Sequence, residues 1–175
     1  MSNSVNKNVN SLLYKRFTTL AIINSIIAVF WTLLFILPIN LSQTLQRILV
    51  GGGPGVWLII GYILFIAIGC LGFIGLAVIT LNINQPTRIM NFLLSIGIVM
   101  LYVGTLGSTL GLGIAGSLGG YSSTILHEPT SVTASILEPL VTPIQIFSLI
   151  AIIGALILMI GFLMVGIHEN KRIHT

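Results

Sequence analysis

Four long uncharged stretches alternate with short polar segments along this sequence. The only charged residues between Arg16 and Glu169 lie beside turn-like sequences: Arg47, Arg88, Glu128 and Glu138. A charge at the centre of a membrane helix costs about 2.5–3.5 kcal/mol, whereas about 20 consecutive apolar residues cross the hydrocarbon core as a helix. The pattern therefore predicts four transmembrane helices, at residues 18–39, 56–83, 89–112 and 144–167.

Residues typical of turns separate the predicted helices. We expect outer connectors at residues 40–55 and 113–143. Asn82, Asn84, Gln85 and Pro86 are expected to end the second helix, and Arg88 to lie in a tight turn before the third. The first connector ends in Gly-Gly-Gly-Pro-Gly, a sequence that interrupts helices. The second begins with a glycine- and serine-rich stretch and then holds three prolines, so the third helix is expected to end near Leu112.

Composition agrees with a membrane protein and leaves no room for a second domain. The 175 residues are 55% hydrophobic and 6% charged, with a mean hydropathy of +1.11. Soluble domains are roughly 25% charged. Four spans with their connectors use the whole length, so we expect residues 1–175 to form a single all-α integral membrane domain, a four-transmembrane-helix bundle.

Basic residues predict how the bundle is oriented. Six of them flank the helix ends that share one side of the membrane: Lys7, Lys15, Arg16, Arg88, Lys171 and Arg172. The two outer connectors contain only Arg47. Because cytoplasmic segments carry the excess of Lys and Arg, we expect a multi-pass protein of the cell membrane with both termini cytoplasmic. The same clustering at the chain ends explains the basic pI without a nucleic-acid partner.

Small residues recur on one face of each of the first three predicted helices and more loosely on the fourth, and such residues permit close approach of backbones in lipid. The predicted packing residues are Ala21, Asn24, Ser25 and Ala28 on the first helix, Gly61, Gly69, Gly72 and Gly75 on the second, Gly97, Gly104, Gly107 and Gly111 on the third, and Gly154 and Gly161 on the fourth. These faces favour a tight bundle, or a bundle packed against other integral membrane subunits. The alternative is that glycine is simply common in membrane helices.

The predicted spans contain no Asp, Glu, Lys, Arg or His. Pumps, ion-coupled carriers and voltage sensors normally keep ionisable groups in the membrane, and a haem in a membrane bundle needs His ligands there. The motif Gly111-Leu-Gly-Ile-Ala-Gly116 ends a span instead of following a strand, so it does not indicate nucleotide binding. Cys70 stands alone, which excludes an internal disulfide. We expect no cofactor, only bound lipids of the bilayer.

Three residues near the second outer connector form the one candidate metal site. His127, Glu128 and Glu138 carry suitable ligand atoms, but their spacing matches no zinc motif. A role in stabilising the connector is the favoured interpretation, and a metal-dependent activity is the alternative.

The stretch Gly53–Tyr62 (GPGVWLIIGY), continuing through Gly69, Gly72, Phe73 and Gly75, resembles transmembrane segments of the catalytic subunit of haem–copper oxidases. Short four-span archaeal membrane proteins show such local similarity. The family's metal ligands are intramembrane histidines, and this chain has none to receive that role. The resemblance implies a scaffold related to a respiratory or copper-dependent membrane enzyme, without its active site.

These features favour a non-catalytic accessory subunit of a larger integral membrane enzyme complex, of the respiratory oxidase or copper membrane monooxygenase type. The alternative is a small channel or carrier that acts as an oligomer. Its pore would be lined by the polar side chains of the spans: Asn24, Ser25, Thr32 and Ser108.

Overall fold

A computed structural model describes residues 2–37, 39–81 and 87–173, with side chains described from Leu13 to Val165. Residues 82–86, which include those predicted to end the second helix, lie outside the described residues. The described part is entirely helical and contains these elements: α1 (Ser2–Ile36), α2 (Asn40–Val50), the 3₁₀ turn η1 (Gly53–Gly55), α3 (Val56–Leu64), the π-helix η2 (Phe65–Gly72), α4 (Phe73–Leu81), α5 (Arg88–Gly120), the π-helical turn η3 (Tyr121–Ile125) and α6 (Thr130–Ile173).

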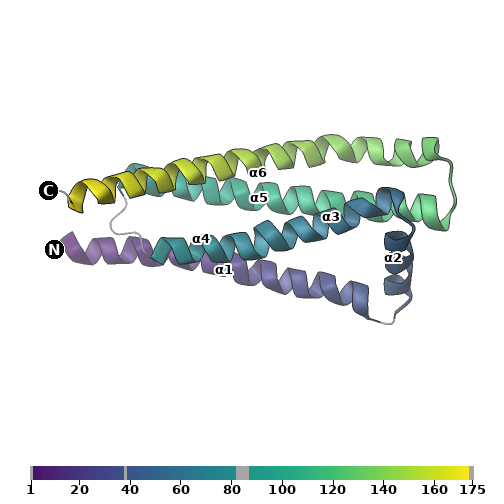
Figure 1. The fold of residues 1–175 in the computed structure, drawn as a ribbon, viewed down its shortest axis with the longest axis horizontal. Coiled ribbons are helices and arrows are strands. Elements are labelled where there is room, and N and C mark those ends of the chain that lie inside the picture. The colour runs from purple at the N-terminus through teal and green to yellow at the C-terminus, as the bar shows by residue number, and fades with distance from the viewer. Residues whose placement is uncertain (1, 38, 82–86, 174–175) are drawn as a thin grey trace.

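The long helices form two side-by-side pairs (Figure 1). One pair consists of α1 and the continuous rod α3–η2–α4, and the other consists of α5 and α6. The N-terminal end of α1 and the C-terminal end of α6 lie at the same end of the molecule, while α2 lies across the opposite end. Four helical segments are long and apolar enough to cross a membrane: Leu13–Ile36, Gly53–Leu81, Arg88–Ile125 and Thr130–Val165. The prediction of an all-α protein with four apolar helices is confirmed.

The most extensive contact is between α5 and α6, and glycines on both helices make it close. A Cβ atom on Gly104 would overlap the backbone of Ala151, and one on Gly154 would overlap the backbone of Leu101. Gly107 lies against the ring of Phe147 in the same way. Helices in lipid associate through such van der Waals contact because burial away from water offers them little.

A second face of α5 packs against α3 and α1. Gly61 of α3 lies against the Thr109 carbonyl, and Gly116 of α5 lies against the backbone of Leu58. A Cβ atom on Gly113 would come within 3.0 Å of the Trp31 ring on α1. Glycines on two faces thus place α5 in the middle of the bundle.

Large side chains fill the bundle toward the end that holds the termini. Phe17 of α1 and Phe73 of α4 are fully buried, with ring centroids 6.1 Å apart, and Tyr102 of α5 meets Phe73 edge-on at 5.9 Å. Leu94 and Leu158 extend the same apolar cluster onto α5 and α6. Here the two helix pairs are held together by side chains instead of by backbone contact.

The predicted connector at residues 113–143 is wrong in its extent. Helix α5 continues to Gly120, and η3 extends the helical segment to Ile125. Because α6 begins at Thr130, only residues 126–129 connect η3 to α6. A glycine in a helix costs about 1 kcal/mol relative to alanine, but Gly116 and Gly120 pack against Leu58 and Ile48. Those contacts offset the cost, and the glycine-rich sequence stays helical.

Two of the three prolines predicted to lie in that connector, Pro139 and Pro143, are inside α6. A proline in a helix removes one backbone hydrogen bond, and membrane helices tolerate it because neighbouring groups satisfy the freed carbonyl. The reading of these prolines as helix breakers is therefore a second correction, and α6 is much longer than its predicted apolar core.

The predicted connector at residues 40–55 also contains a helix, α2, which covers the end of α1. The Ser42 hydroxyl donates to the Leu34 carbonyl, and Gln46 Nε2 donates to the Phe35 carbonyl at 2.7 Å. The last carbonyls of a helix have no partners within the helix. Side chains of α2 supply the missing hydrogen-bond donors, which explains why a polar segment folds back across α1. The chain then turns at Gly52 and Gly53, whose φ angles are +71° and +57°.

We predict that Gly104→Ala destabilises the bundle by about 2 kcal/mol, the usual cost of overpacking, because the new methyl group overlaps the Ala151 backbone. Unfolding in mixed micelles, followed by the fluorescence of Trp31 and Trp57, measures the change. Gly75→Ala is the matched control, since a Cβ atom there meets nothing within 4 Å. Equal destabilisation by both variants would contradict the packing described for α5 and α6.

Candidate functional site

The one amide among the buried polar side chains of the described residues, Asn24, lies at the contact between α1 and the π-helix η2. Asn24 is only 1% exposed, and its Nδ2 donates to the Gly69 carbonyl at 2.7 Å. At the end of η2 the Phe73 N–H donates to the Cys70 carbonyl instead of to Gly69, its usual α-helical acceptor. The Asn24 amide therefore supplies a donor to a carbonyl that the helix has left without its normal one. Asn24 ties α1 to the one irregular turn of the rod α3–η2–α4.

The π-helix also explains which face of this rod is buried. Besides Leu58, Cys70 and Thr80, a row of buried positions recurs every four residues along the rod: Gly61, Phe65, Gly69, Phe73 and Ala77. In a pure α-helix this spacing would drift by about 40° at each step. Hydrogen bonds from i to i+5 put more residues in each turn, which keeps the spacing on one face.

That change of register moves two predicted packing glycines away from the bundle. Gly72 has only atoms of its own helix near it, and Gly75 is exposed with no atom within 4 Å of a Cβ position. The prediction placed them on one strip with Gly61 and Gly69 by assuming 100° per residue throughout. The π-turns break that assumption, so this part of the predicted face is corrected.

The other predicted packing residues lie at contacts between helices. Ala21 belongs to the cluster that contains Phe73 and Ala77, and Ala28 belongs to the one that contains Phe65 and Cys70. On the other helix pair, four contacts pair a glycine with a large side chain: Gly97 with Leu158, Gly107 with Phe147, Gly111 with Ile144, and Gly161 with Leu94.

The side chains predicted to line a pore do not share a hollow in the described structure. The hydroxyls of Ser25, Thr32 and Ser108 each donate to a carbonyl of their own helix, and Asn24 bonds Gly69. Ser25 lines the groove between α1 and α4, and none of the other three residues lines it. A polar path through a single copy of the bundle has no support from these positions.

The Thr32 hydroxyl also lies 2.6 Å from the Tyr62 hydroxyl, which joins α1 to α3 near the α2 end. Trp31 and Phe35 pack edge-on against the Tyr62 ring, at centroid distances of 5.8 and 5.7 Å. Buried tyrosine hydroxyls require a partner, and Thr32 provides it. These residues form a structural contact with no reactive group.

The candidate metal ligands do not come together. His127 and Glu128 are exposed in the short turn before α6, and Glu138 is exposed on α6 itself, eight residues after its first residue. Eight residues of α-helix correspond to about 12 Å. Among the described residues, no three His, Cys, Asp or Glu side chains form a group suited to a metal ion. His127 has a left-handed φ of 54°, which fits its place in a tight turn.

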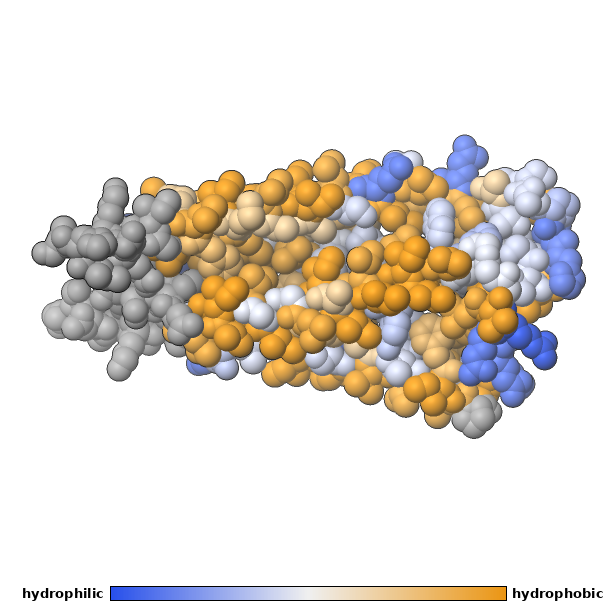
Figure 2. All heavy atoms as spheres, viewed as in Figure 1, coloured by the Kyte–Doolittle hydropathy of each residue, from blue (hydrophilic) through white to orange (hydrophobic). Residues whose placement is uncertain are grey.

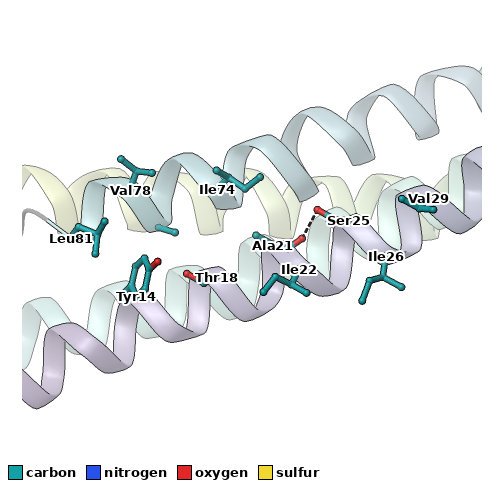
Figure 3. Close-up of a pocket in the computed structure, with 11 residues that line it drawn as sticks. Tyr14, Thr18, Ala21, Ile22, Ser25, Ile26, Val29, Ile74, Val78 and Leu81 are labelled. Carbon is teal, nitrogen blue, oxygen red and sulfur yellow. Dashed lines mark hydrogen bonds between the residues drawn. The ribbon is translucent and has the colours of Figure 1, made fainter.

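A long apolar groove runs between α1 and α4 (Figure 3). Its volume is about 490 Å³, and the small residues Ala21, Ser25 and Ala77 lie among larger aliphatic side chains such as Ile22 and Val78. The Ser25 hydroxyl turns back to the Ala21 carbonyl at 2.8 Å. Figure 2 shows apolar residues over the middle of the molecule and hydrophilic residues gathered toward the α2 end. The groove is therefore a recess in an apolar surface, without reactive groups.

Sequence reasoning missed two features of this architecture. The glycines after Gly111 were assigned to a connector, although Gly113, Gly116 and Gly120 recur at helical spacing and could have shown a second packing face. It also missed a contact between α1 and α5, where Arg16 Nη1 donates to Ser95 Oγ at 3.1 Å. Nothing in the sequence pairs those two positions.

No protein-family model, curated protein or solved structure matches this chain. The resemblance of residues 53–75 to haem–copper oxidase segments therefore stays a prediction. In the structure this stretch forms η1, α3, η2 and the start of α4.

We predict that Asn24→Leu destabilises the bundle by about 1 kcal/mol, within the range measured for hydrogen bonds between membrane helices. The effect is modest because Asn24 Oδ1 is buried without a hydrogen-bond partner among the described residues, and the substitution removes that unfavourable group as well. Ser117→Ala is the control, since its hydroxyl donates to the Gly113 carbonyl of its own helix, α5. Unfolding in mixed micelles compares the two variants, and an Asn24→Leu effect no larger than that of Ser117→Ala would contradict the role given to the amide.

Proposed function

We propose that this protein is a non-catalytic accessory subunit of a larger integral membrane enzyme complex. The α1–α4 groove carries the proposal: it is an apolar recess of about 490 Å³, as long as several helical turns, that the described residues leave open. An apolar transmembrane helix of a partner subunit has the shape and the surface to occupy this groove.

Gly75 supports a partner helix at this face. It is exposed on α4, next to the groove residue Ile74, and makes no contact that would offset the cost of a glycine in a helix, about 1 kcal/mol relative to alanine. Glycine on a membrane helix face permits close backbone approach by another helix. A contact with another chain would give Gly75 the packing role that its own chain does not.

The remaining surface is suited to lipid and to further subunits. Large aliphatic side chains are exposed along α1, α4 and α6, including Ile26, Val78 and Leu163. The described residues bring together no cluster of metal-ligating or acid–base groups that would make the chain an enzyme by itself. The resemblance of residues 53–75 to oxidase segments is what points to a respiratory oxidase or a copper membrane monooxygenase as the host complex.

In the orientation that we propose, the N-terminal end of α1 and the C-terminal end of α6 face the cytoplasm. The basic residues Lys15, Arg16 and Arg88 belong to that end, whereas Arg47 lies on α2 at the other. The excess of Lys and Arg on cytoplasmic segments supports this arrangement in the cell membrane.

We predict that Gly75→Ile abolishes stoichiometric co-purification of partner subunits from native membranes in a gentle detergent, because the larger side chain occupies the space left for a partner helix. Mass spectrometry of the purified complex gives the readout. Ala155→Ile on the exposed face of α6 is the matched control and should retain the partners. A monodisperse free protein without a stoichiometric partner, or equal loss with both variants, would contradict the proposal.

Labelling tests the orientation in a variant that lacks the native thiol, Cys70→Ala. A membrane-impermeant maleimide applied to intact cells should label Ser131→Cys, at the start of α6, because we place that end outside. Thr87→Cys, just before α5, should react only after the membrane is opened. Both positions are exposed. The reverse pattern of labelling would show that the orientation is wrong.

A further inference from the structure

A second groove, between α1 and α5, differs from the α1–α4 groove in carrying charge at one end. It has a volume of about 510 Å³ and is lined by Lys15, Arg16, Thr19, Leu20, Ser95, Ile98 and Val99. The two helices run in the same direction from the end that holds the termini (Figure 1). Lys15, Arg16 and Ser95 therefore lie nearer that end, and Leu20, Ile98 and Val99 lie about one helical turn, roughly 5 Å, deeper.

We propose that this groove binds one anionic phospholipid, with its phosphate on Lys15 and Arg16 and an acyl chain along the apolar wall. The lining changes from cationic to apolar in the order that a phospholipid changes from head group to tail. Basic pockets between membrane helices on the cytoplasmic side are known to suit anionic head groups. A soluble anion would match only the outer part of the groove, and an apolar helix would match only the inner part.

The Arg16–Ser95 hydrogen bond prepares the guanidinium for this role. Arg16 Nη1 donates to Ser95 Oγ at 3.1 Å, which holds the side chain across the groove. A guanidinium has five N–H donors, and this neutral contact uses one of them. Arginine in a fixed orientation suits the paired oxygens of a phosphate.

The surrounding charge favours an anion. Six of the seven basic residues belong to segments at this end of the molecule, whereas Glu128 and Glu138 lie near the opposite end. Glu169 is the one acidic residue at the basic end, and its side chain lies outside the described part. The groove is independent of the proposed partner site, because the two grooves are lined by different residues on opposite flanks of α1.

Native mass spectrometry of the full chain in a neutral detergent tests the lipid site. We expect one phosphatidylglycerol to remain bound, in preference to phosphatidylcholine with the same acyl chains. Arg16→Gln should weaken retention roughly fivefold and Lys15→Gln with Arg16→Gln roughly thirtyfold, the scale set by the contribution of each basic residue near an anionic lipid. Arg88→Gln, a basic residue at the same end but outside the groove, is the control and should retain the lipid.

Filling the apolar wall separates a lipid from a free anion. Val99→Trp should displace phosphatidylglycerol, whereas Leu156→Trp, on the exposed face of α6 and away from the groove, should not. Glycerol phosphate, which has no acyl chain, should fail to compete at equal concentration. Equal retention of the two lipids, equal loss with Arg88→Gln, or full competition by glycerol phosphate would overturn the proposal. Each of these results leaves the partner test at Gly75 unaffected.

Discussion

Hydrocarbon gives the helices of this protein little reason to associate except direct contact between their surfaces, and that constraint makes α5 the organising element. Glycines on one face bring it against the backbone of α6, and glycines on another bring it against α3. The positions of α3 and α6 relative to α5 are therefore set by close backbone contact at these glycines. Where the pairs move apart, Phe17, Phe73 and Leu94 fill the space. The bundle combines two kinds of contact because one central helix cannot approach every neighbour equally closely.

The same solvent also requires that backbone polar groups find partners inside the protein. Two irregular places show how the chain meets this requirement. At the end of α1, Ser42 and Gln46 of α2 donate to carbonyls that have no helical partner. In the π-helix, Asn24 donates to the Gly69 carbonyl. Asn24, the most polar of the predicted pore residues, is therefore engaged in satisfying the backbone of the π-helix.

With α5 and its glycines used inside the bundle, α1 offers two open flanks. The flank beside α4 is largely apolar and fits a partner helix, with Gly75 nearby to allow close approach. The flank beside α5 is basic at one end and fits an anionic lipid. Both proposals concern binding, which agrees with a chain whose described residues contain no grouped metal ligands. The two sites can be occupied together, because they lie on opposite sides of the same helix.

The sequence by itself determined the helical class and the four apolar segments, because charges excluded from long apolar runs are a property of composition and order alone. Helical periodicity also places small residues such as Gly104 and Gly154 on one face, and these two lie at the contact between α5 and α6. Only the tertiary structure decided where the helices end and which face of the rod α3–η2–α4 is buried. Contacts with Leu58 and Ile48 keep the glycines after Gly111 helical, and the π-turns rotate Gly75 outward. Such effects depend on partners distant in the chain, and local pattern cannot reveal them.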